Sequence, residues 1–391
     1  MAEDPDEVEE KTFPDMDLAQ KVFLLECGLD SPEVLEATKT EILSVVKQDA
    51  MAPYYEFLCA RFSWNVDDAL LAEMTAANTT ELAELKETVS GHEQHDGETE
   101  VLDALFAIAK FFARIGDKSQ AFAAYDTIIE KAKVSTGKKI DAGMHKLRVA
   151  LFYLDTSAAK KFIDAVKKLA ENGGDWDRRN RIKVYESIFR LTERDFSTSA
   201  ELLLGGLASF TCTEVCSYEK FVQYAVITNL LKLNRPDLKK KVVDGAEVLS
   251  VVQSLGPLPA MYEGLYHCDY QSFFRSLVPL YDLLLRDRYL SGHARFLIRE
   301  FRILVYGQYL EAYKSVKLDT MAAAFGVSNS FLDSELSRFI ATNRLSAKID
   351  KVGGLVETNR PDAKNAQYHS MIKKGDVLLN QIQKLARVID V

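Results

Sequence analysis

Apolar side chains recur every three or four residues along most of the chain, the spacing of an α-helix that buries one face. Five apolar residues share one face of the stretch that begins at Thr99: Leu102, Leu105, Phe106, Ala109 and Phe112. Gly116-Asp117 is expected to end this helix. A second face then follows: Ala121, Tyr125, Ile128 and Ile129. Small Ala121 allows close approach and Tyr125 fills the space beside it, so the pattern predicts a packed helix pair.

The helix pair recurs at a nearly constant interval. Asp117, Asp155 and Asp195 each precede an amphipathic segment, at separations of 38 and 40 residues. Each aspartate stands where an N-cap acceptor is needed. Residues of similar character occupy matching offsets: Ala121 with Ala159, and Tyr125 with Ile163 and Leu203. A period in this range is typical of tetratricopeptide-like arrays, whose units bury their apolar faces by stacking. A non-repetitive helical bundle is the alternative interpretation.

Three further helices are predicted downstream of the repeats, over residues 218–233, 238–255 and 270–285. Asn234-Arg235-Pro236 is expected to close the first of them, and Gly256-Pro257 to close the second. A polar stretch at 90–98 (SGHEQHDGE) is expected to separate an N-terminal helical region from the repeats. The chain is therefore predicted to be mainly α-helical, with a solenoid in its middle.

The C-terminal third has a different pattern. A long apolar helix is predicted over 296–313, then a short helix over 320–325, Gly326-Val327, and a helix over 329–342. The last of these has a predicted buried stripe: Phe331, Leu332, Leu336, Phe339 and Ile340. Two helices joined by a short turn that contains glycine are typical of a helix-turn-helix.

A clear β pattern follows directly. Leu345, Ala347 and Ile349 alternate with polar residues, the period of two that a strand requires. Gly353-Gly354 permits a tight turn, after which Leu355 begins a returning strand. A helix-turn-helix followed by a hairpin predicts a winged helix, and we expect these four apolar residues to contribute to a protein interface.

Winged helices often bind DNA, so the charge of this module matters. The candidate recognition helix carries Asp333, Glu335 and Arg338, a net charge of −1. A surface that follows phosphates needs an excess of Lys and Arg. The whole chain has a net charge of −9. Protein docking is therefore favoured over nucleic-acid binding, which stays an alternative.

The final helix, over about 366–389, has an apolar seam. Leu378, Ile382, Leu385 and Ile389 follow one another at steps of four, three and four residues, the spacing of a coiled coil. Such a helix either folds back on its own domain or joins helices of other chains, and the pattern leaves both open.

Candidate chemistry is sparse. Five scattered cysteines are interpreted as reduced thiols of a cytosolic or nuclear protein, since disulfide frameworks favour even sets in short secreted chains. The acidic first ten residues are expected to be disordered, and neither they nor any apolar run fits a signal peptide or membrane span. HEQH at His92–His95 is one residue short of the zinc-protease spacing, and Cys212 with Cys216 has no second pair. No catalytic residue, cofactor or metal site is predicted.

One basic stretch allows two interpretations. GGDWDRRNR places Arg178, Arg179 and Arg181 beside Trp176. In the favoured interpretation it is a structural joint between repeats, with the double glycine ending one helix, an aspartate capping the next and Trp176 packed between them. In the other, the three arginines bind an acidic partner.

Several of these segments resemble the PCI-domain subunits of the 26S proteasome lid. They are MAPYYE, RIGDK, GGDWDRRNRIKVY, NRPDL and, most specifically, AFGVSNSFLDSELSRFIATNRLSAKIDKV with the VETNRPDAKNAQYHS that follows. The resemblance implies right-handed helical repeats that run into a winged helix. It also implies that the winged helix packs beside the winged helices of sister subunits. It also implies C-terminal helices gathered in one bundle.

The resemblance further implies a non-catalytic scaffold with a fixed set of neighbours. These are other PCI-domain lid subunits, a small acidic lid protein and the ATPase ring, in a hetero-oligomeric complex without nucleic acid or membrane. The expected segments are 1–98, 99–290, 291–361 and 362–391, with helices from about 190 counted into the PCI module. Subunit 1 of the COP9 signalosome, from a paralogous complex, is the alternative within this class.

Overall fold

The computed structural model describes residues 12–95, 97–131, 134–359 and 363–389. The expectation of disorder for the first ten residues lies outside these ranges. By its internal contacts the chain divides into two compact units, Met1–Tyr266 with Arg275–Ile298, and His267–Phe274 with Arg299–Val391. This division differs from the four predicted segments, which describe functional organisation and stay a prediction.

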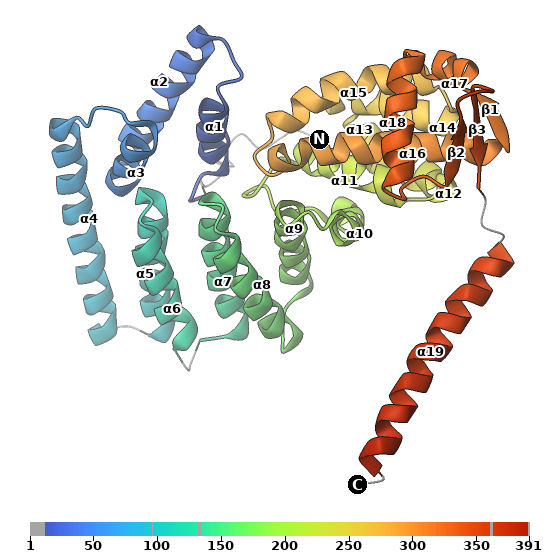
Figure 1. Ribbon diagram of the computed structural model, residues 1–391. Coiled ribbons are helices and arrows are strands. Elements are labelled where there is room, and N and C mark those ends of the chain that lie inside the picture. Colours follow the sequence, from blue (N-terminus) through green and yellow to red (C-terminus); the bar gives the residue numbers. More distant parts are fainter. Residues whose placement is uncertain (1–11, 96, 132–133, 360–362, 390–391) are drawn as a thin grey trace. The chain divides into compact units, whose positions relative to one another are not determined.

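The described residues are mostly helical, as expected (Figure 1). The helices up to the end of the repeats are α1 Met16–Cys27, α2 Pro32–Gln48, α3 Ala52–Phe62, α4 Asp68–His95, α5 Glu98–Ile115, α6 Lys118–Glu130, α7 Thr136–Phe152, α8 Thr156–Glu171, α9 Trp176–Thr192 and α10 Phe196–Gly206. Those that follow are α11 Tyr218–Lys232, α12 Arg235–Leu238, α13 Ala246–Ser250, α14 Leu258–His267, α15 Tyr270–Leu285, α16 Ala294–Ala312, α17 Leu318–Phe325, α18 Asn329–Ala341 and α19 Ala363–Ile389. Helices α5 to α10 stack in sequence order as antiparallel pairs, which confirms the helical-repeat solenoid.

The three repeat aspartates cap helices as predicted. Asp117 accepts a hydrogen bond from the Gln120 amide at 3.0 Å, Asp155 from Ala158 at 3.0 Å and Asp195 from Thr198 at 3.2 Å. Each carboxylate thereby satisfies one of the amide donors that a helix start leaves without a partner. The same local interaction thus begins the second helix of each pair.

The residue before each capping aspartate adopts the left-handed conformation. These residues are Gly116 (φ 78°), Leu154 (φ 52°) and Arg194 (φ 67°). Only the first is glycine, where a β-carbon would also lie 2.7 Å from Cβ of Tyr54. At the third, the Arg194 guanidinium lies 4.0 Å from the centre of the Phe296 ring, a cation–π contact that helps to offset the backbone strain.

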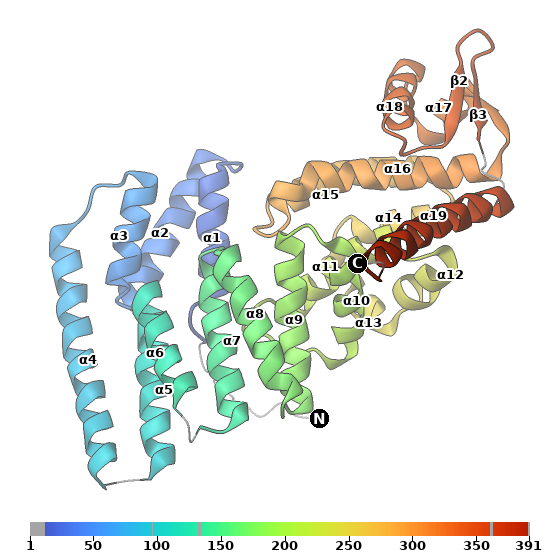
Figure 2. The same ribbon diagram turned by 60° about the horizontal axis from the view of Figure 1, so that its bottom comes forward.

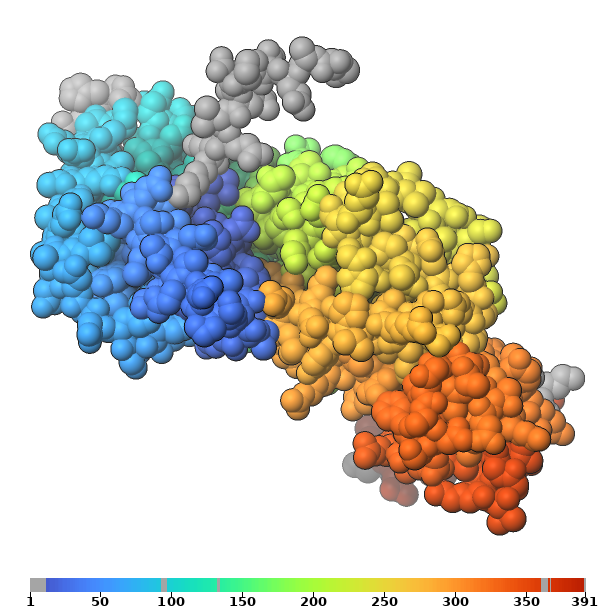
Figure 3. All heavy atoms as spheres, turned by 90° about the horizontal axis from the view of Figure 1, so that it is seen from above, coloured from blue at the N-terminus to red at the C-terminus, as the bar shows by residue number. Residues whose placement is uncertain are grey.

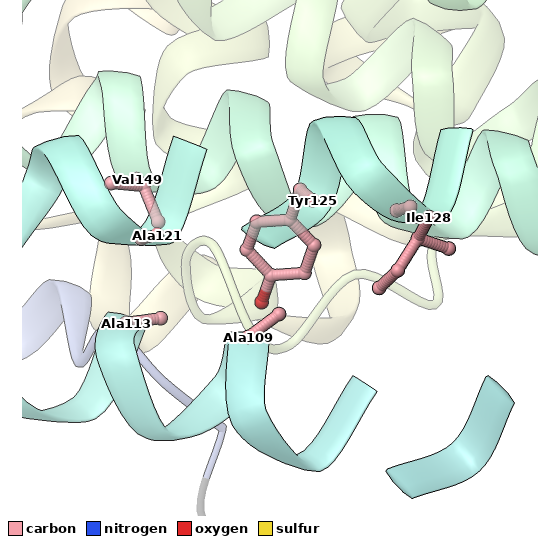
Figure 4. Packing of buried hydrophobic residues seen from close by; sticks show 7 residues of the cluster. Ala109, Ala113, Ala121, Tyr125, Ile128 and Val149 are labelled. Atoms are coloured by element: carbon pink, nitrogen blue, oxygen red, sulfur yellow. The ribbon is translucent and has the colours of Figure 1, made fainter. Parts of the chain in front are cut away.

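The core between repeats follows the predicted offsets. At this offset the first two repeats have Ala121 and Ala159 and the third repeat has Ser199, and each is at most 1% exposed. The buried Ser199 hydroxyl donates to the Ser187 carbonyl oxygen at 3.0 Å, so a polar residue fits this position without an unpaired group. Figure 4 shows the Tyr125 ring reaching from α6 towards Ala109 of α5, where the small side chain makes room for it.

Two elements of the first unit differ from the prediction. The helix expected over 238–255 is broken into α12, a π-helical turn Lys239–Val243, α13 and a 3-10 turn Val252–Leu255. Gly245 is extended (φ −65°, ψ 120°) and interrupts the run, because glycine favours the helix weakly. The polar stretch 90–98 is largely helical instead, since α4 continues to His95 and α5 begins at Glu98 after Gly97.

A loop between α15 and α16 ties the N-terminal helices to the repeats. The Gln20 side chain donates to the Arg286 carbonyl oxygen at 2.6 Å and accepts from the Arg288 amide at 3.2 Å. Arg286 also pairs with Asp30 at 2.7 Å, and the Arg288 guanidinium donates to the carbonyl oxygen of Phe152 at the end of α7. Figure 3 shows the N-terminal helices, in blue, against this part of the chain.

Asp287, within the same loop, is buried and fully bonded. One carboxylate oxygen accepts the Tyr224 hydroxyl at 2.6 Å. The other accepts the amides of Tyr289 and Leu290 at 2.9 and 3.1 Å. Burial raises the pKa of this carboxyl group above its ordinary value. The carboxylate thus joins α11 to the turn that leads into α16.

The second unit contains a winged helix, as predicted. Helices α17 and α18 are followed by strands β2 Ala347–Asp350 and β3 Leu355–Thr358, with Gly354 in the left-handed conformation (φ 61°) (Figure 2). A third strand, β1 Ser315–Lys317, was not predicted, because three residues are too few for a period to show. The strand order is β1-β3-β2, antiparallel, with Val356 opposite both Val316 and Ile349.

The stripe predicted for α18 is partly wrong. Leu332, Leu336 and Phe339 are buried, Ile340 is only half-buried and Phe331 is 41% exposed. The fourth strongly buried position is Glu335, at 8% exposure. Its carboxylate accepts from Arg302 at 2.5 Å and from the Tyr306 hydroxyl at 3.0 Å, both on α16. A charged side chain can occupy the buried face here because both of its oxygens find donors.

Candidate assembly surfaces

The C-terminal helix α19 presents its apolar seam to solvent. The four seam residues Leu378, Ile382, Leu385 and Ile389 are between 56% and 72% exposed, and every side chain described on this helix is exposed. Further apolar residues widen the stripe: Tyr368, Met371, Ile372 and Leu379. A stripe of this width is typical of a helix in a bundle with several neighbours, and a two-stranded coiled coil needs only a narrower seam.

The hairpin residues proposed as an interface divide into two groups. Leu345 and Ala347 are 7% and 5% exposed and belong to the core of the winged helix itself. Ile349 and Leu355 are half-buried. The most exposed apolar side chain of the hairpin is Val352, at its tip, with 100% exposure. An interface on the hairpin would therefore use Val352 together with Ile349 and Leu355. Leu345 and Ala347 instead support the strand from the core.

Several charged side chains of the winged helix are buried or paired within the module, which bears on nucleic-acid binding. Glu335, which contributes to the negative charge expected of the recognition helix, is turned inward. On the surface, Lys351 pairs with Asp333 at 3.1 Å, and Arg344 pairs with Glu300. Two of the hairpin cations thus have carboxylate partners within the module, which reduces the charge available for phosphates.

The arginine-rich segment joins adjacent repeats. Arg178 makes a two-pronged contact with Asp141 of α7, at 2.9 and 2.8 Å, and Arg181 pairs with the largely buried Glu214 at 2.6 Å. Bidentate arginine–carboxylate pairs are among the stronger contacts of this kind. Asp175 caps α9 by accepting from the Trp176 amide at 2.7 Å. The structural interpretation therefore holds for Arg178 and Arg181. The expectation that Trp176 is packed between helices is wrong, because its side chain is 67% exposed.

These contacts belong to a ladder along the starts of α5, α7 and α9. Lys138 pairs with Asp103 at 2.7 Å, Arg178 with Asp141, and Thr211 donates to Asp177 at 3.2 Å. Each step links one repeat to the next by a side chain 34 to 37 residues further on. The ladder fixes the spacing of neighbouring repeats at their polar edge.

A hollow of about 840 Å³ opens on these same helices. Its charged lining balances, with four acidic and four basic groups: Asp103, Asp141, Asp175, Asp177, Lys110, Lys138, Arg178 and Arg181. Four of these eight groups pair with one another, Asp103 with Lys138 and Asp141 with Arg178. Since Asp175, Asp177 and Arg181 bind groups outside this set, the hollow does not have the free groups that a catalytic site needs.

His145 forms part of this hollow and is held neutral. Its ring stacks on Tyr125 with centroids 5.8 Å apart, and Nδ1 accepts from the Arg148 guanidinium at 3.0 Å. Burial, and next the charge of Arg148, lowers the pKa of His145 to about 3. A proton on this ring would face a guanidinium at hydrogen-bond distance, so the side chain acts as an acceptor in the core.

We expect acid to destabilise the chain through His145. Its pKa is about 6.5 unfolded and about 3 folded, so the unfolded state binds a proton first as the pH falls. Stability is therefore full above pH 6.5 and is lost below it, by about 2 kcal/mol between pH 7 and pH 5. Urea unfolding at both pH values tests this, with His145→Gln as the control, since glutamine keeps an acceptor without titrating. Equal pH dependence of the two proteins would contradict it.

Metal and thiol chemistry find no support in the described part of the chain. No group of three or more His, Cys, Asp or Glu side chains there is arranged to hold a metal. The five cysteines are free thiols. Burial raises the pKa of Cys212 to about 12 and also raises that of Cys216, so both favour the unreactive thiol form.

Comparison with known proteins agrees with this architecture. Residues 67–241 match the family described as 26S proteasome subunit RPN7, residues 280–360 the PCI domain, and residues 367–389 the RPN7/PSMD6 C-terminal helix. The 26S proteasome non-ATPase regulatory subunit 6 homolog of Arabidopsis thaliana is 46% identical over 96% of this chain and 97% of its own. The chain belongs to the RPN7 family.

One further relative is similar over nearly the whole chain, and another over less than half of it. The 26S proteasome regulatory subunit RPN7 of Saccharomyces cerevisiae is 39% identical over 96% of this chain and 93% of its own. Subunit 1 of the COP9 signalosome complex of Arabidopsis thaliana is 28% identical over 42% of this chain and 37% of its own. The predicted resemblance to PCI-domain proteasome subunits is therefore confirmed.

In this RPN7-family chain, the sequence analysis did not predict that two acidic residues, Glu335 and Asp287, are buried and hydrogen-bonded. Glu335 stands three residues after Leu332 and four before Phe339, on the buried face, so its spacing was a usable signal. Asp287 gave no such signal, because its partners lie on α11 and in its own turn.

No helix in the described ranges has the length and apolar character that crossing a membrane requires.

Proposed function

We propose that the chain is a non-catalytic scaffold subunit of the proteasome regulatory particle lid and supports ubiquitin-dependent protein degradation. The exposed apolar stripe of α19 carries the proposal, because a helix with so many uncovered apolar side chains needs a partner surface. The half-buried hairpin residues Ile349 and Leu355 are proposed to contribute a second contact, and Arg179 a third.

The size of the stripe supports assembly through more than one surface. Burying Leu378, Ile382, Leu385 and Ile389 would contribute about 6–12 kcal/mol, at roughly 1.5–3 kcal/mol each. Association costs are of the order of 4–15 kcal/mol. Since the two ranges overlap, α19 alone gives at best moderate affinity, and contacts of the winged helix are needed for a stable complex.

The proposed partners follow from the family. They are other PCI-domain lid subunits, the small acidic lid protein and the ATPase ring, in a hetero-oligomeric complex of the cytoplasm and nucleus. A scaffold of the COP9 signalosome type is the second candidate within the class, with lower identity over less of the chain. A winged-helix nucleic-acid binder is disfavoured, because surface cations of the hairpin pair with acids of the same module.

Deleting residues 366–391 should leave a folded repeat domain that no longer enters the particle. Because α19 is exposed throughout its described length, removing it uncovers little core. The same result is expected for Leu378→Asp combined with Ile382→Asp, with at least tenfold less co-purification of lid subunits, since burying a charge in an apolar interface is costly. Affinity purification from cells that express each variant, with circular dichroism of the purified chain, measures both properties.

The matched control places charge on the opposite face of α19. Asn380→Asp combined with Lys384→Asp changes the same helix over the same turns but leaves the seam intact. This variant should co-purify with lid subunits as the parent does. Normal incorporation of the truncated chain would refute the role of α19.

A further inference from the structure

A cluster of cations lies on the short helix α12 and the π-helical turn that follows it. Residues 235–241 contain four basic side chains and a single acid, Asp237. The four are all exposed, and no ion pair joins any of them to a carboxylate of the described residues: Arg235, Lys239, Lys240 and Lys241. Lys232, just before them on α11, pairs with Glu201 at 2.5 Å by contrast. We call the four residues the α12 basic cluster.

Two cations of the cluster converge on one aromatic ring. The Arg235 guanidinium lies 5.2 Å and the Lys239 ammonium 5.6 Å from the centre of the Tyr266 ring, at the end of α14. Arg235 also donates to the Tyr266 carbonyl oxygen at 2.6 Å, which fixes its position. The ring attracts each cation but leaves the repulsion between the two uncompensated. An anion bound to both would offset this repulsion.

The backbone holds the cluster in an unusual turn. In the π-helical segment Lys239–Val243 the Asp244 amide donates to the Lys239 carbonyl oxygen, five residues earlier, at 2.8 Å. Gly245 permits this turn, because a β-carbon there would lie 2.5 Å from the carbonyl oxygen of Lys241. Segments of this kind are rare and are frequent at functional sites. The turn therefore presents consecutive lysines on a backbone that the fold holds in one shape.

We infer that the α12 basic cluster binds a compact anion with clustered phosphate groups, such as an inositol polyphosphate. Phosphate oxygens accept from arginine in a forked geometry and from lysine as a point charge, so Arg235 and Lys239 supply complementary donors. A compact ligand fits better than a long one, because Asp237 and Asp244 stand beside the cations and repel an extended acidic chain. The Tyr266 ring already contacts two cations, which disfavours stacking on a nucleic-acid base.

This ligand site is separate from the surfaces proposed for assembly. The α12 basic cluster includes no residue of α19 or of the winged helix. The inference therefore goes beyond the proposed function, and its test measures binding of a small anion by the free chain. Either can fail without the other.

Isothermal titration calorimetry of the full chain with inositol hexakisphosphate tests the inference. One ligand should bind per chain, with an affinity that falls as salt is added. Lys239→Ala combined with Lys240→Ala should weaken binding at least about tenfold, since two charge-assisted hydrogen bonds are lost. Gly245→Ala keeps every charge and should still weaken binding at least about threefold, because the turn has to change shape.

The matched control removes two lysines of α8. Lys161 and Lys168 are exposed and have no ion pair among the described residues, so Lys161→Ala combined with Lys168→Ala changes the net charge equally. This variant should keep the parent affinity within about twofold. Circular dichroism and thermal unfolding show whether each variant is folded. An equal loss in the two double variants would overturn the inference, because it would show general electrostatic attraction. Parent affinity in Gly245→Ala would overturn the assignment to a shaped site.

Lipid headgroups also carry clustered phosphates, so a second arm separates the two sources. The chain is sedimented with phosphatidylcholine vesicles that contain about 5% phosphatidylinositol bisphosphate. Sedimentation that is lost when Lys239 and Lys240 are both replaced by Ala would support a headgroup ligand. Binding of inositol hexakisphosphate without sedimentation would support a soluble one. Absence of binding in both arms would overturn the inference.

Discussion

Replacing Asp287 by alanine is expected to lower the free energy of unfolding of the first unit by about 3–5 kcal/mol. The substitution leaves the Tyr224 hydroxyl and the amides of Tyr289 and Leu290 without an acceptor in a buried site. Each buried donor left without a partner costs about 1–3 kcal/mol. Amide hydrogen exchange of α11 and of the turn at 287–290 measures the loss locally, and urea unfolding measures it globally.

Two control variants show whether the loss of stability comes from the hydrogen bonds of Asp287 or only from the removal of a carboxylate. Tyr224→Phe removes one of the three hydrogen bonds and should cost about 1 kcal/mol. Asp282→Ala removes an exposed carboxylate of the same helix region and should change stability by less than about 0.5 kcal/mol. If Asp287→Ala cost no more than Tyr224→Phe, the two backbone amides would contribute nothing, and our account of this turn would be wrong.

In the second unit, Glu335→Ala is expected to detach α18 from α16. The change leaves the Arg302 guanidinium, which pairs with Glu335 at 2.5 Å, and the Tyr306 hydroxyl without their acceptor. Breaking a buried pair by removing one partner costs about 3–5 kcal/mol, because the remaining charge is uncompensated. Faster hydrogen exchange in α18 and a lower unfolding temperature should report the loss.

The control for Glu335 lies on the same helix. Asp333 pairs with Lys351, whose side chain is 73% exposed, so Asp333→Ala should cost less than about 1 kcal/mol. Glu335→Gln keeps an acceptor for Tyr306 but loses the charge opposite Arg302 and should fall between the two. A loss in Asp333→Ala as large as in Glu335→Ala would show that removing any acid from α18 has the same effect.

The features that could be predicted from the sequence are those with local causes. The aspartates that cap repeat helices act within three residues of themselves, so their spacing was enough to place the solenoid. The winged helix was found in the same way, since the alternation at 345–349 and the glycines of the turn are local signals. Periodicity also located the seam of α19.

The features that were missed depend on distant contacts or on very short segments. Strand β1 exists because Val316 pairs with Val356, forty residues away. Trp176 was expected to be packed because it is apolar, but the joint between repeats is made by Arg178 and Arg181 with acids of neighbouring elements. Which helix faces are uncovered follows only from the complete set of packing contacts, so the exposure of Trp176 could not be predicted from the sequence.

The bonds between Gln20 and the loop at 286–288 bear on how the chain folds during its synthesis. The N-terminal helices leave the ribosome first, yet the residues that Gln20 binds are made 266 and 268 positions later. At roughly 5–20 residues per second, α1 waits about 15–50 s for this contact. During that interval α1 has α2 beside it but lacks its bonds to the loop, and a chaperone that binds short amphipathic helices would have time to act on the nascent chain.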